Sequence, residues 1–166
     1  MFFKVFEKLD RLFKFDEARA HCDVPCGIYD LHQAQVGALT VIRMIDLMND
    51  LKAAHAPETL EYQNSMARYI LVKEEHAELV KREVRVIFGD YVKQEQLDKF
   101  PELPGLMHKI MQVGAKYRQT TSREAAMDLL KAVNRFAEIY WATKNIETKK
   151  VKAPYKPGEE IIYPVL

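Results

Sequence analysis

Cysteine is scarce in this sequence, and long apolar runs are absent from it. Only two cysteines occur among 166 residues, which leaves no framework of structural disulfides and fits a reducing compartment such as the cytoplasm. No apolar stretch approaches the roughly 20 residues that a helix needs to cross a bilayer. The net charge of +1 gives no electrostatic case for binding nucleic acid. With 48% hydrophobic residues, the composition is that of one ordinary globular domain.

Both cysteines lie in one ten-residue run, His21-Cys22-Asp23-Val24-Pro25-Cys26-Gly27-Ile28-Tyr29-Asp30. Pro25 and Gly27 bend the backbone, so the run can fold around one small ion. Thiolate and imidazole donors suit zinc, copper, nickel and iron, although a four-ligand zinc site would need one more side chain. If the chain began at His21, its amine, the Cys22 amide nitrogen and the two thiolates would form a plane. Square-planar nitrogen and sulfur donors favour Ni(II) or Cu(II) over Zn(II).

Residues 1–20 precede this histidine and have the character of a removable leader. The small residues Ala18 and Ala20 form a candidate processing site, and cleavage after Ala20 would expose the amine of His21. Charged residues interrupt the apolar positions, so the segment does not match a secretory signal. Its apolar residues fall on one face of a short amphipathic helix. An ordinary docking or membrane-surface helix is the alternative.

The ten-residue run resembles the nickel hook of nickel-dependent superoxide dismutases, whose pattern is His-Cys-Asp-x-Pro-Cys-Gly-x-Tyr-Asp. Every fixed position of that pattern is matched. The resemblance covers residues 21 to about 145 and continues, in the family's order, through the segments 73–79, 90–93, 100–103 and 139–144. It implies a superoxide dismutase with one nickel ion per subunit, assembled as a homohexamer of helical bundles. A peptidase would remove the leader.

The resemblance also implies which residues bind the metal. His21 would bind nickel through its amine and, in the oxidised metal, through its imidazole. Cys22 would contribute its amide nitrogen and its thiolate, and Cys26 its thiolate. Tyr29 and Tyr91 match tyrosines that order water and admit only small anions.

Three further residues match positions around this centre. Asp23, grouped with the two tyrosines as a catalytic residue, and Asp90 match supporting positions. Lys93 matches a lysine at the entrance, where positive charge raises the local concentration of superoxide. Dismutation would alternate Ni(II) and Ni(III), taking an electron from one superoxide and giving it to the next with two protons.

Two positions depart from the best-known version of the family pattern. There, a glutamate on the first helix and an arginine of a neighbouring subunit hold the histidine ring, whereas Gly37 and His76 stand at those positions here. The lost anion and the lost cation can offset each other, and His76 or water would then orient the His21 ring. Such partners tune metal ligands, so the rate or the metal affinity would differ while the reaction stays the same.

The spacing of apolar residues predicts an all-α fold. Four helices are expected, from Asp30 to about Ala54, Pro57 to about Tyr91, Pro101 to about Tyr117 and Thr121 to about Thr148. Short connections between amphipathic helices predict an antiparallel up-and-down four-helix bundle over residues 31–148, behind the hook at 21–30. No strand alternation is evident. Residues 149–166, with three prolines, are expected to form an extended tail that packs on a neighbouring subunit or frays.

Two other functions are compatible with the residues alone. A nickel- or copper-binding carrier or sensor could use the same hook without turnover, and the residues at Gly37 and His76 motivate this alternative. A thiol redox protein would instead use Cys22 and Cys26 as a reversible disulfide, although no C-x-x-C motif at a helix start supports it. The remaining histidines are expected at the surface or between helices: His32, His55 and His108.

Overall fold

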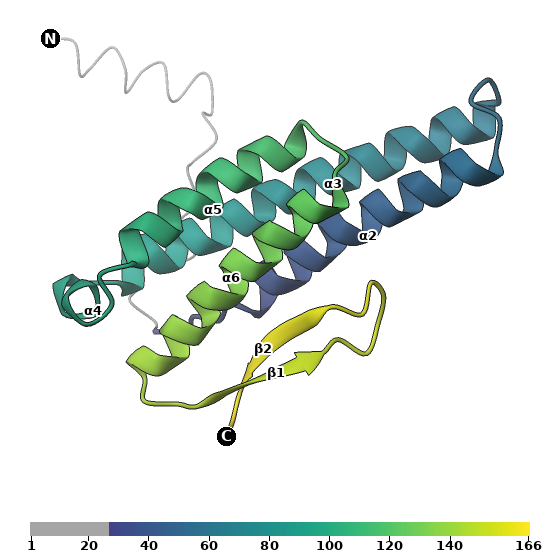
Figure 1. Cartoon of the computed structure of the whole chain (residues 1–166). Helices are drawn as coiled ribbons and strands as arrows, with labels where there is room; N and C mark the ends of the chain where they lie inside the picture. Colours follow the sequence, from purple (N-terminus) through teal and green to yellow (C-terminus); the bar gives the residue numbers. More distant parts are fainter. Residues whose placement is uncertain (1–26) are drawn as a thin grey trace, which may run out of the picture.

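A computed structural model describes residues 27–166, apart from the side chains of residues 116–118. Four long helices form a bundle (Figure 1): α2 (His32–Ala54), α3 (Leu60–Val86), α5 (Leu103–Arg118) and α6 (Arg123–Thr143). Helix α2 contacts α3, α3 contacts α5, α5 contacts α6, and α6 contacts α2. This cycle confirms the predicted four-helix bundle. None of the helices within 27–166 is long and apolar enough to cross a membrane.

Side chains accept backbone N–H groups at the beginnings of three of these helices, and in α3 and α6 the accepting residue is the N-cap itself. Asp30 Oδ1 accepts the backbone N–H of His32 at 2.8 Å, where α2 begins close to its predicted start. Thr59 caps α3 by accepting an N–H of the first turn at 3.2 Å, so this helix begins after Thr59 and not at Pro57. Ser122 caps α6 in the same way, one position later than the predicted cap. Each hydroxyl or carboxylate satisfies an N–H that has no partner inside the helix.

Helix α6 ends at Thr143, before the predicted end at Thr148. Asn145 adopts a left-handed conformation with φ of 58°. The N–H of Ile146 then reaches back to the carbonyl oxygen of Trp141 at 3.1 Å. This is the Schellman arrangement that commonly closes a helix, with asparagine at the left-handed position.

The end of α3 changes its winding. A π turn, η1 (Ile87–Tyr91), continues the helix, and the N–H of Val92 bonds to the carbonyl oxygen of Ile87 at 3.3 Å. The predicted extent up to Tyr91 is therefore correct, but the π winding was not predicted. A short helix, α4 (Gln94–Lys99), follows; it contains no buried residue and so gives no apolar stripe in the sequence. Single π turns are frequent at functional sites.

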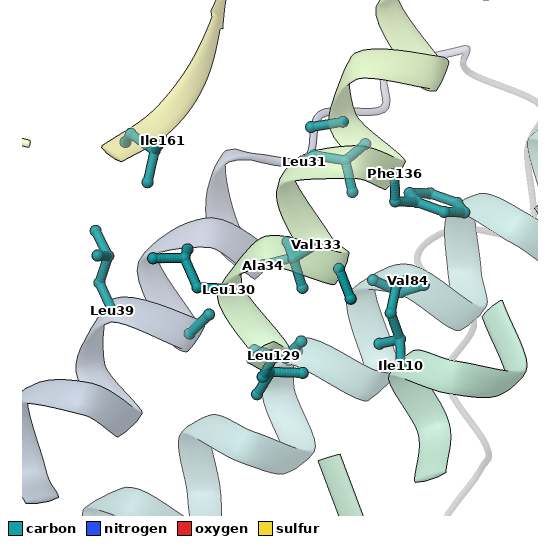
Figure 2. Packing of buried hydrophobic residues seen from close by; sticks show 14 of the residues in the cluster. Leu31, Ala34, Leu39, Val84, Ile110, Leu129, Leu130, Val133, Phe136 and Ile161 are labelled. Atoms are coloured by element: carbon teal, nitrogen blue, oxygen red, sulfur yellow. The ribbon is translucent and has the colours of Figure 1, made fainter. Parts of the chain in front are cut away.

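Aliphatic and aromatic side chains from all four long helices fill the interior (Figure 2). Ala34 of α2, Val84 of α3, Ile110 of α5 and Phe136 of α6 are each at most 1% exposed. Burial of a large apolar side chain contributes roughly 1.5 to 3 kcal/mol. Val84, Ile110 and Phe136 lie on the apolar faces expected from the sequence, whereas Ala34 was not among the expected core positions of its helix.

Gly37 lets α2 and α3 approach closely. A Cβ atom placed on Gly37 would lie 2.9 Å from Val80 Cγ2 and 3.3 Å from the carbonyl oxygen of His76. Non-bonded carbon atoms are most stable at about 3.5 to 4.0 Å. The space needed by the neighbouring helix therefore accounts for glycine at this position, and His76 lies directly opposite it.

The C-terminal residues form an antiparallel hairpin, which corrects the expectation of a tail without strands. Strand β1 (Thr148–Lys152) pairs with β2 (Glu160–Pro164), and the hairpin lies against the bundle (Figure 1). Ile161 and Ile162 are 0% and 2% exposed. Because consecutive residues of β2 are both buried, the strand lacks the alternation by which a half-buried strand is recognised.

Two polar side chains of the bundle hold this hairpin in place. The amide of Gln35 on α2 donates to the carbonyl oxygen of Ile162 at 3.1 Å and accepts its N–H at 2.6 Å. Asn134 of α6 donates to the carbonyl oxygen of Glu160 at 2.8 Å. Gln35 thus bonds to β2 as a neighbouring strand would. The strand residues of the tail pack on their own bundle, so this part of the tail is not frayed.

Replacing Ile161 with alanine is expected to lower the free energy of unfolding by about 2 to 4 kcal/mol, because it leaves a cavity between the hairpin and the helices. Val165→Ala is the matched control, since Val165 is 48% exposed and should change stability by less than about 0.5 kcal/mol. Urea unfolding of the metal-free protein measures both. Equal midpoints for the two variants would contradict the packing of the hairpin.

Candidate metal centre

The predicted ligand run lies outside the described residues, and with it five predicted site residues: Ala20, His21, Cys22, Asp23 and Cys26. The described chain starts at Gly27, whose φ of 70° is readily adopted by glycine. Among residues 27–166, no three His, Cys, Asp or Glu side chains are grouped so as to hold a metal ion. The described residues therefore contribute the surroundings of the predicted centre and not its ligand set.

Three tyrosine rings gather where the chain enters α2. The ring centroids of Tyr29 and Tyr91 are 5.9 Å apart, and those of Tyr91 and Tyr140 are 5.1 Å apart in an edge-on arrangement. The π turn at the end of α3 carries Tyr91, whereas Tyr140 comes from α6. The structure thus brings together the two tyrosines named from the sequence and adds a third.

Hydrogen bonds fix the direction of the Tyr91 hydroxyl. Thr143 Oγ1 lies 2.5 Å from Tyr91 Oη and 2.6 Å from the carbonyl oxygen of Tyr140. A carbonyl oxygen only accepts, so the single hydroxyl proton of Thr143 goes to Tyr140. Tyr91 is therefore the donor to Thr143, and its oxygen keeps lone pairs that can accept a proton from water.

A lysine lies against two of these rings. Lys144 Nζ lies 4.9 Å from the ring centroid of Tyr91 and 5.2 Å from that of Tyr140. Cation–π attraction at an exposed site contributes about 0.5 to 1 kcal/mol. Lys144 thereby holds a positive charge beside the tyrosine cluster.

Asp90 and Lys93 flank Tyr91 on the same stretch of chain, and both are exposed. Asp90 belongs to the π turn. Lys93 stands at the start of α4, where its backbone N–H donates to Gln96 Oε1 at 2.9 Å. The structure therefore places both residues next to a cluster tyrosine and open to solvent.

His76 lies beside Gly37 but not beside the tyrosines. It precedes Tyr91 by 15 residues of helix, which is roughly 20 Å along the axis. Its Nδ1 is 2.9 Å from the carbonyl oxygen of Val72. Because that oxygen only accepts, Nδ1 carries a proton, and Nε2 of the neutral ring is an acceptor.

A hollow of about 160 Å³ lies next to Tyr29. Its lining includes Ile28, Asp30 and Gln33 from the start of the described chain and Glu83 from α3. Glu83 Oε1 accepts from Arg82 at 3.2 Å, and its side chain is 15% exposed. A shielded carboxylate thus borders the segment that leads to the predicted ligands.

Burial raises the pKa of Tyr140 to about 12, with smaller contributions from Tyr91, Asp30 and Tyr29. Tyrosine in an unfolded chain titrates near pH 10. The contribution of Tyr140 to stability is therefore complete below about pH 10 and is lost as the pH rises toward about 12. We expect the melting temperature of the metal-free protein to fall over this range, and to fall less steeply in Tyr140→Phe. Thermal unfolding at a series of pH values tests this; equal slopes would contradict it.

Sequence reasoning missed Tyr140, Thr143, Lys144 and Glu83 as parts of this region. Tyr140, Thr143 and Lys144 are spaced i, i+3 and i+4, which places them on one helix face. That spacing was a usable signal. Tyr140 was instead assigned to the apolar face of its helix. The position of Glu83 depends on how α3 packs beside the start of α2, and no local pattern indicates it.

Comparison with known proteins identifies the family. The sequence model described as "Nickel-containing superoxide dismutase" matches residues 16–144. "Superoxide dismutase [Ni]" of Streptomyces seoulensis is 31% identical over 125 residues, which cover 75% of this chain and 88% of that protein. The corresponding protein of Streptomyces coelicolor is 30% identical over the same shares.

Solved structures agree with these sequence matches. The native nickel superoxide dismutase structure superposes with a TM-score of 0.64 at 30% identity and covers 75% of this chain and 99% of that chain. A crystal structure of a nickel-containing superoxide dismutase with nickel ligation of the oxidised state gives a TM-score of 0.65 at 30% identity and the same coverage. The matches in sequence and in structure each extend over three quarters of the molecule. This chain belongs to the nickel-containing superoxide dismutase family.

Proposed function

We infer that this protein is a nickel-dependent superoxide dismutase, an oxidoreductase that converts superoxide to dioxygen and hydrogen peroxide. The complete hook pattern from His21 to Asp30 carries this inference, because it precedes a bundle of the same family. Nickel, when bound, supplies the one-electron chemistry by alternating between Ni(II) and Ni(III).

The donor set of the hook fits nickel. His21 would bind through its amine and its imidazole, Cys22 through its amide nitrogen and thiolate, and Cys26 through its thiolate. Nitrogen and sulfur donors in a plane suit Ni(II), and thiolates with a deprotonated amide donate enough electron density to stabilise Ni(III). Both cysteines of the chain are used in this assignment.

The two tyrosines would control what reaches the metal. Tyr29 and Tyr91 would restrict access to small anions and order water, and Asp23 and Asp90 would support them. The bond between Tyr91 and Thr143 supports a narrower role for Tyr91. Its proton is already donated to Thr143, so it would orient water as an acceptor, and the protons of hydrogen peroxide would come from elsewhere.

Two lysines would draw superoxide to this opening. Lys93 is exposed two positions after Tyr91, and Lys144 holds its charge over the Tyr91 ring. Cations beside a narrow site raise the local concentration of an anionic substrate and speed its association. The contribution of both lysines would weaken with rising salt concentration.

The enzyme assignment is tested by superoxide turnover measured together with bound nickel. A chain that starts at His21 should turn over superoxide in proportion to its nickel content. A nickel-loaded, processed sample without turnover would overturn the assignment and favour the carrier or sensor.

His76 would help to orient the His21 ring. His76 of the same chain lies roughly 20 Å along α3 from Tyr91, and the arginine that it replaces in the family pattern belongs to a neighbouring subunit, so the His76 of a neighbouring subunit would supply this support. Nε2 of the neutral His76 ring could then accept a hydrogen bond. This would replace part of the support that is lost at Gly37.

His76→Ala is accordingly expected to lower superoxide turnover by about tenfold while one nickel ion stays bound, since partners of metal ligands typically contribute 10- to 100-fold. His108→Ala is the matched control, because His108 is exposed on α5. Turnover per bound nickel is the measured quantity. Unchanged turnover would show that His76 does not support the ring.

Maturation would require a peptidase that cuts between Ala20 and His21 and so separates the leader at 1–20 from the hook at 21–30 and the folded part that follows it. Only this cut frees the amine that the nickel site needs. Mass spectrometry of the purified protein tests the position of the cut. An intact leader on a nickel-loaded, active protein would contradict it.

The mature protein would be a homohexamer. Leu60, Ile70 and Leu71 of α3 are 75%, 43% and 57% exposed. Exposed apolar residues gathered on one helix suit a subunit contact better than contact with water. Light scattering of the nickel-loaded protein measures the mass of the assembly.

A cytoplasmic location fits the low cysteine content, and fractionation of cells would test it.

A further inference from the structure

A tyrosine of the bundle is hydrogen-bonded to the segment that leads to the hook. Tyr140 Oη donates a hydrogen bond of 2.6 Å to the backbone carbonyl oxygen of Tyr29, across 111 positions of sequence. Tyr29 follows Cys26 by three positions. The bond therefore anchors the backbone close to the predicted thiolate.

Tyr140 is itself held from several sides. It is 3% exposed, and its ring meets those of Tyr91 and Trp141 edge-on at 5.1 Å each. Its backbone carbonyl oxygen accepts the hydroxyl proton of Thr143. Helix α6 thus fixes the position of the Tyr140 hydroxyl, to which the segment before α2 is hydrogen-bonded.

The same two turns of α6 hold both tyrosines of the opening. Tyr91 is bonded to Thr143, and Tyr29 is bonded through its carbonyl oxygen to Tyr140. The rings of Tyr29 and Tyr91 lie tilted to each other by 52°, with their centroids 5.9 Å apart. Loss of the Tyr140 hydroxyl would remove this bond to the Tyr29 backbone while leaving the bond of Tyr91 intact.

We propose that Tyr140 is a positioning residue of the nickel site, which fixes the end of the hook relative to Tyr91 through its bond to the Tyr29 backbone. The proposal rests on the function inferred above, because it takes the residues before Gly27 as the ligands. Tyr140 acts through Tyr29 and touches neither metal nor superoxide.

Tyr140→Phe tests the proposal, since it removes the hydroxyl and keeps the ring. Tyr69→Phe on α3 is the matched control, because Tyr69 is also packed against the core. Processed, nickel-loaded proteins are compared by the electron paramagnetic resonance spectrum of the oxidised nickel and by the rate of nickel release to a chelator. Tyr140→Phe should give an altered spectrum and release nickel about five times faster, as the loss of one hydrogen bond of ordinary strength predicts.

The proposal is overturned if Tyr140→Phe gives the wild-type spectrum or releases nickel within twofold of the Tyr69→Phe rate. Its failure is distinct from that of the proposed function, which fails when the wild-type protein itself lacks nickel or turnover.

Thr143 gives a second pair of variants for the case in which Tyr140→Phe does not fold. Thr143→Val removes the hydroxyl that supports Tyr140 and Tyr91, whereas Thr143→Ser keeps it. Faster release and an altered spectrum in the valine variant, restored by serine, would support the proposal. Identical behaviour of the two would overturn it.

Discussion

Cys22→Ser is expected to abolish nickel binding and superoxide turnover together. Serine is isosteric with cysteine, but its hydroxyl is not ionised near neutral pH and its oxygen is a harder donor than a thiolate. The site would lose both affinity for Ni(II) and the electron density that makes Ni(III) accessible. A partial loss is not expected, because the same donor serves binding and redox chemistry.

Nickel content and superoxide turnover of purified Cys22→Ser measure this prediction, with Cys26→Ser as the parallel variant. The control is the thermal unfolding of the metal-free proteins. None of the buried core residues within 27–166 is a cysteine, so both variants should unfold like the metal-free wild type. A serine variant that retains nickel and turnover would show that the hook is not the metal site.

A chain that keeps one extra residue before His21 is expected to lose superoxide turnover to background. The amine of His21 becomes a peptide nitrogen, so one of the planar donors is missing. If the total affinity resembles that of other protein metal sites, one donor of four contributes about 3 kcal/mol, and nickel binding weakens by roughly a hundredfold.

The comparison uses two preparations of one chain, released by a protease either directly before His21 or one residue earlier. Both should show the same helical content and melting temperature when metal-free, because they differ outside the folded bundle. Nickel titration and turnover then isolate the free amine. Full turnover by the longer chain would disprove its role as a ligand.

The bundle could be predicted from sequence because each long helix buries one face. Apolar spacing located all four helices, and Asp30 marked the first start. The helix ends were less predictable, because they depend on which residue caps: Thr59 and Ser122 in place of the expected residues, and Asn145 at the end of α6. Local spacing does not rank neighbouring candidates for one cap.

The hairpin was missed for a tertiary reason. Strand β2 packs against α6 with Ile161 and Ile162 both buried, and the side chain of Gln35 on α2 supplies bonds to its backbone. A glutamine in a helix gives no sign that it will pair with a strand 127 positions away.

The residues of the site also differ in whether the sequence alone could identify them. The donor pattern from His21 to Cys26 is local and therefore visible in the sequence. The approach of Tyr29 to Tyr91 could be inferred only from the resemblance to a family, because the residues meet through the packing of α2 against α3. The ring of Tyr140 lies on the apolar face of α6, so apolar spacing assigns this residue to the core and gives no indication that its hydroxyl has a role.

Because Gly37 lies in close contact with α3, the effect of a substitution at this position depends on the residues of α3 that face it. Restoring the family's glutamate by a single substitution would drive a side chain into Val80, which lies 2.9 Å from a Cβ at that position. Overpacking of this kind costs about 1 to 3 kcal/mol. A smaller residue at position 80 would relieve this contact, so the two substitutions are expected to be coupled in their effect on stability. A glutamate at position 37 should therefore destabilise the protein less when residue 80 is smaller than valine.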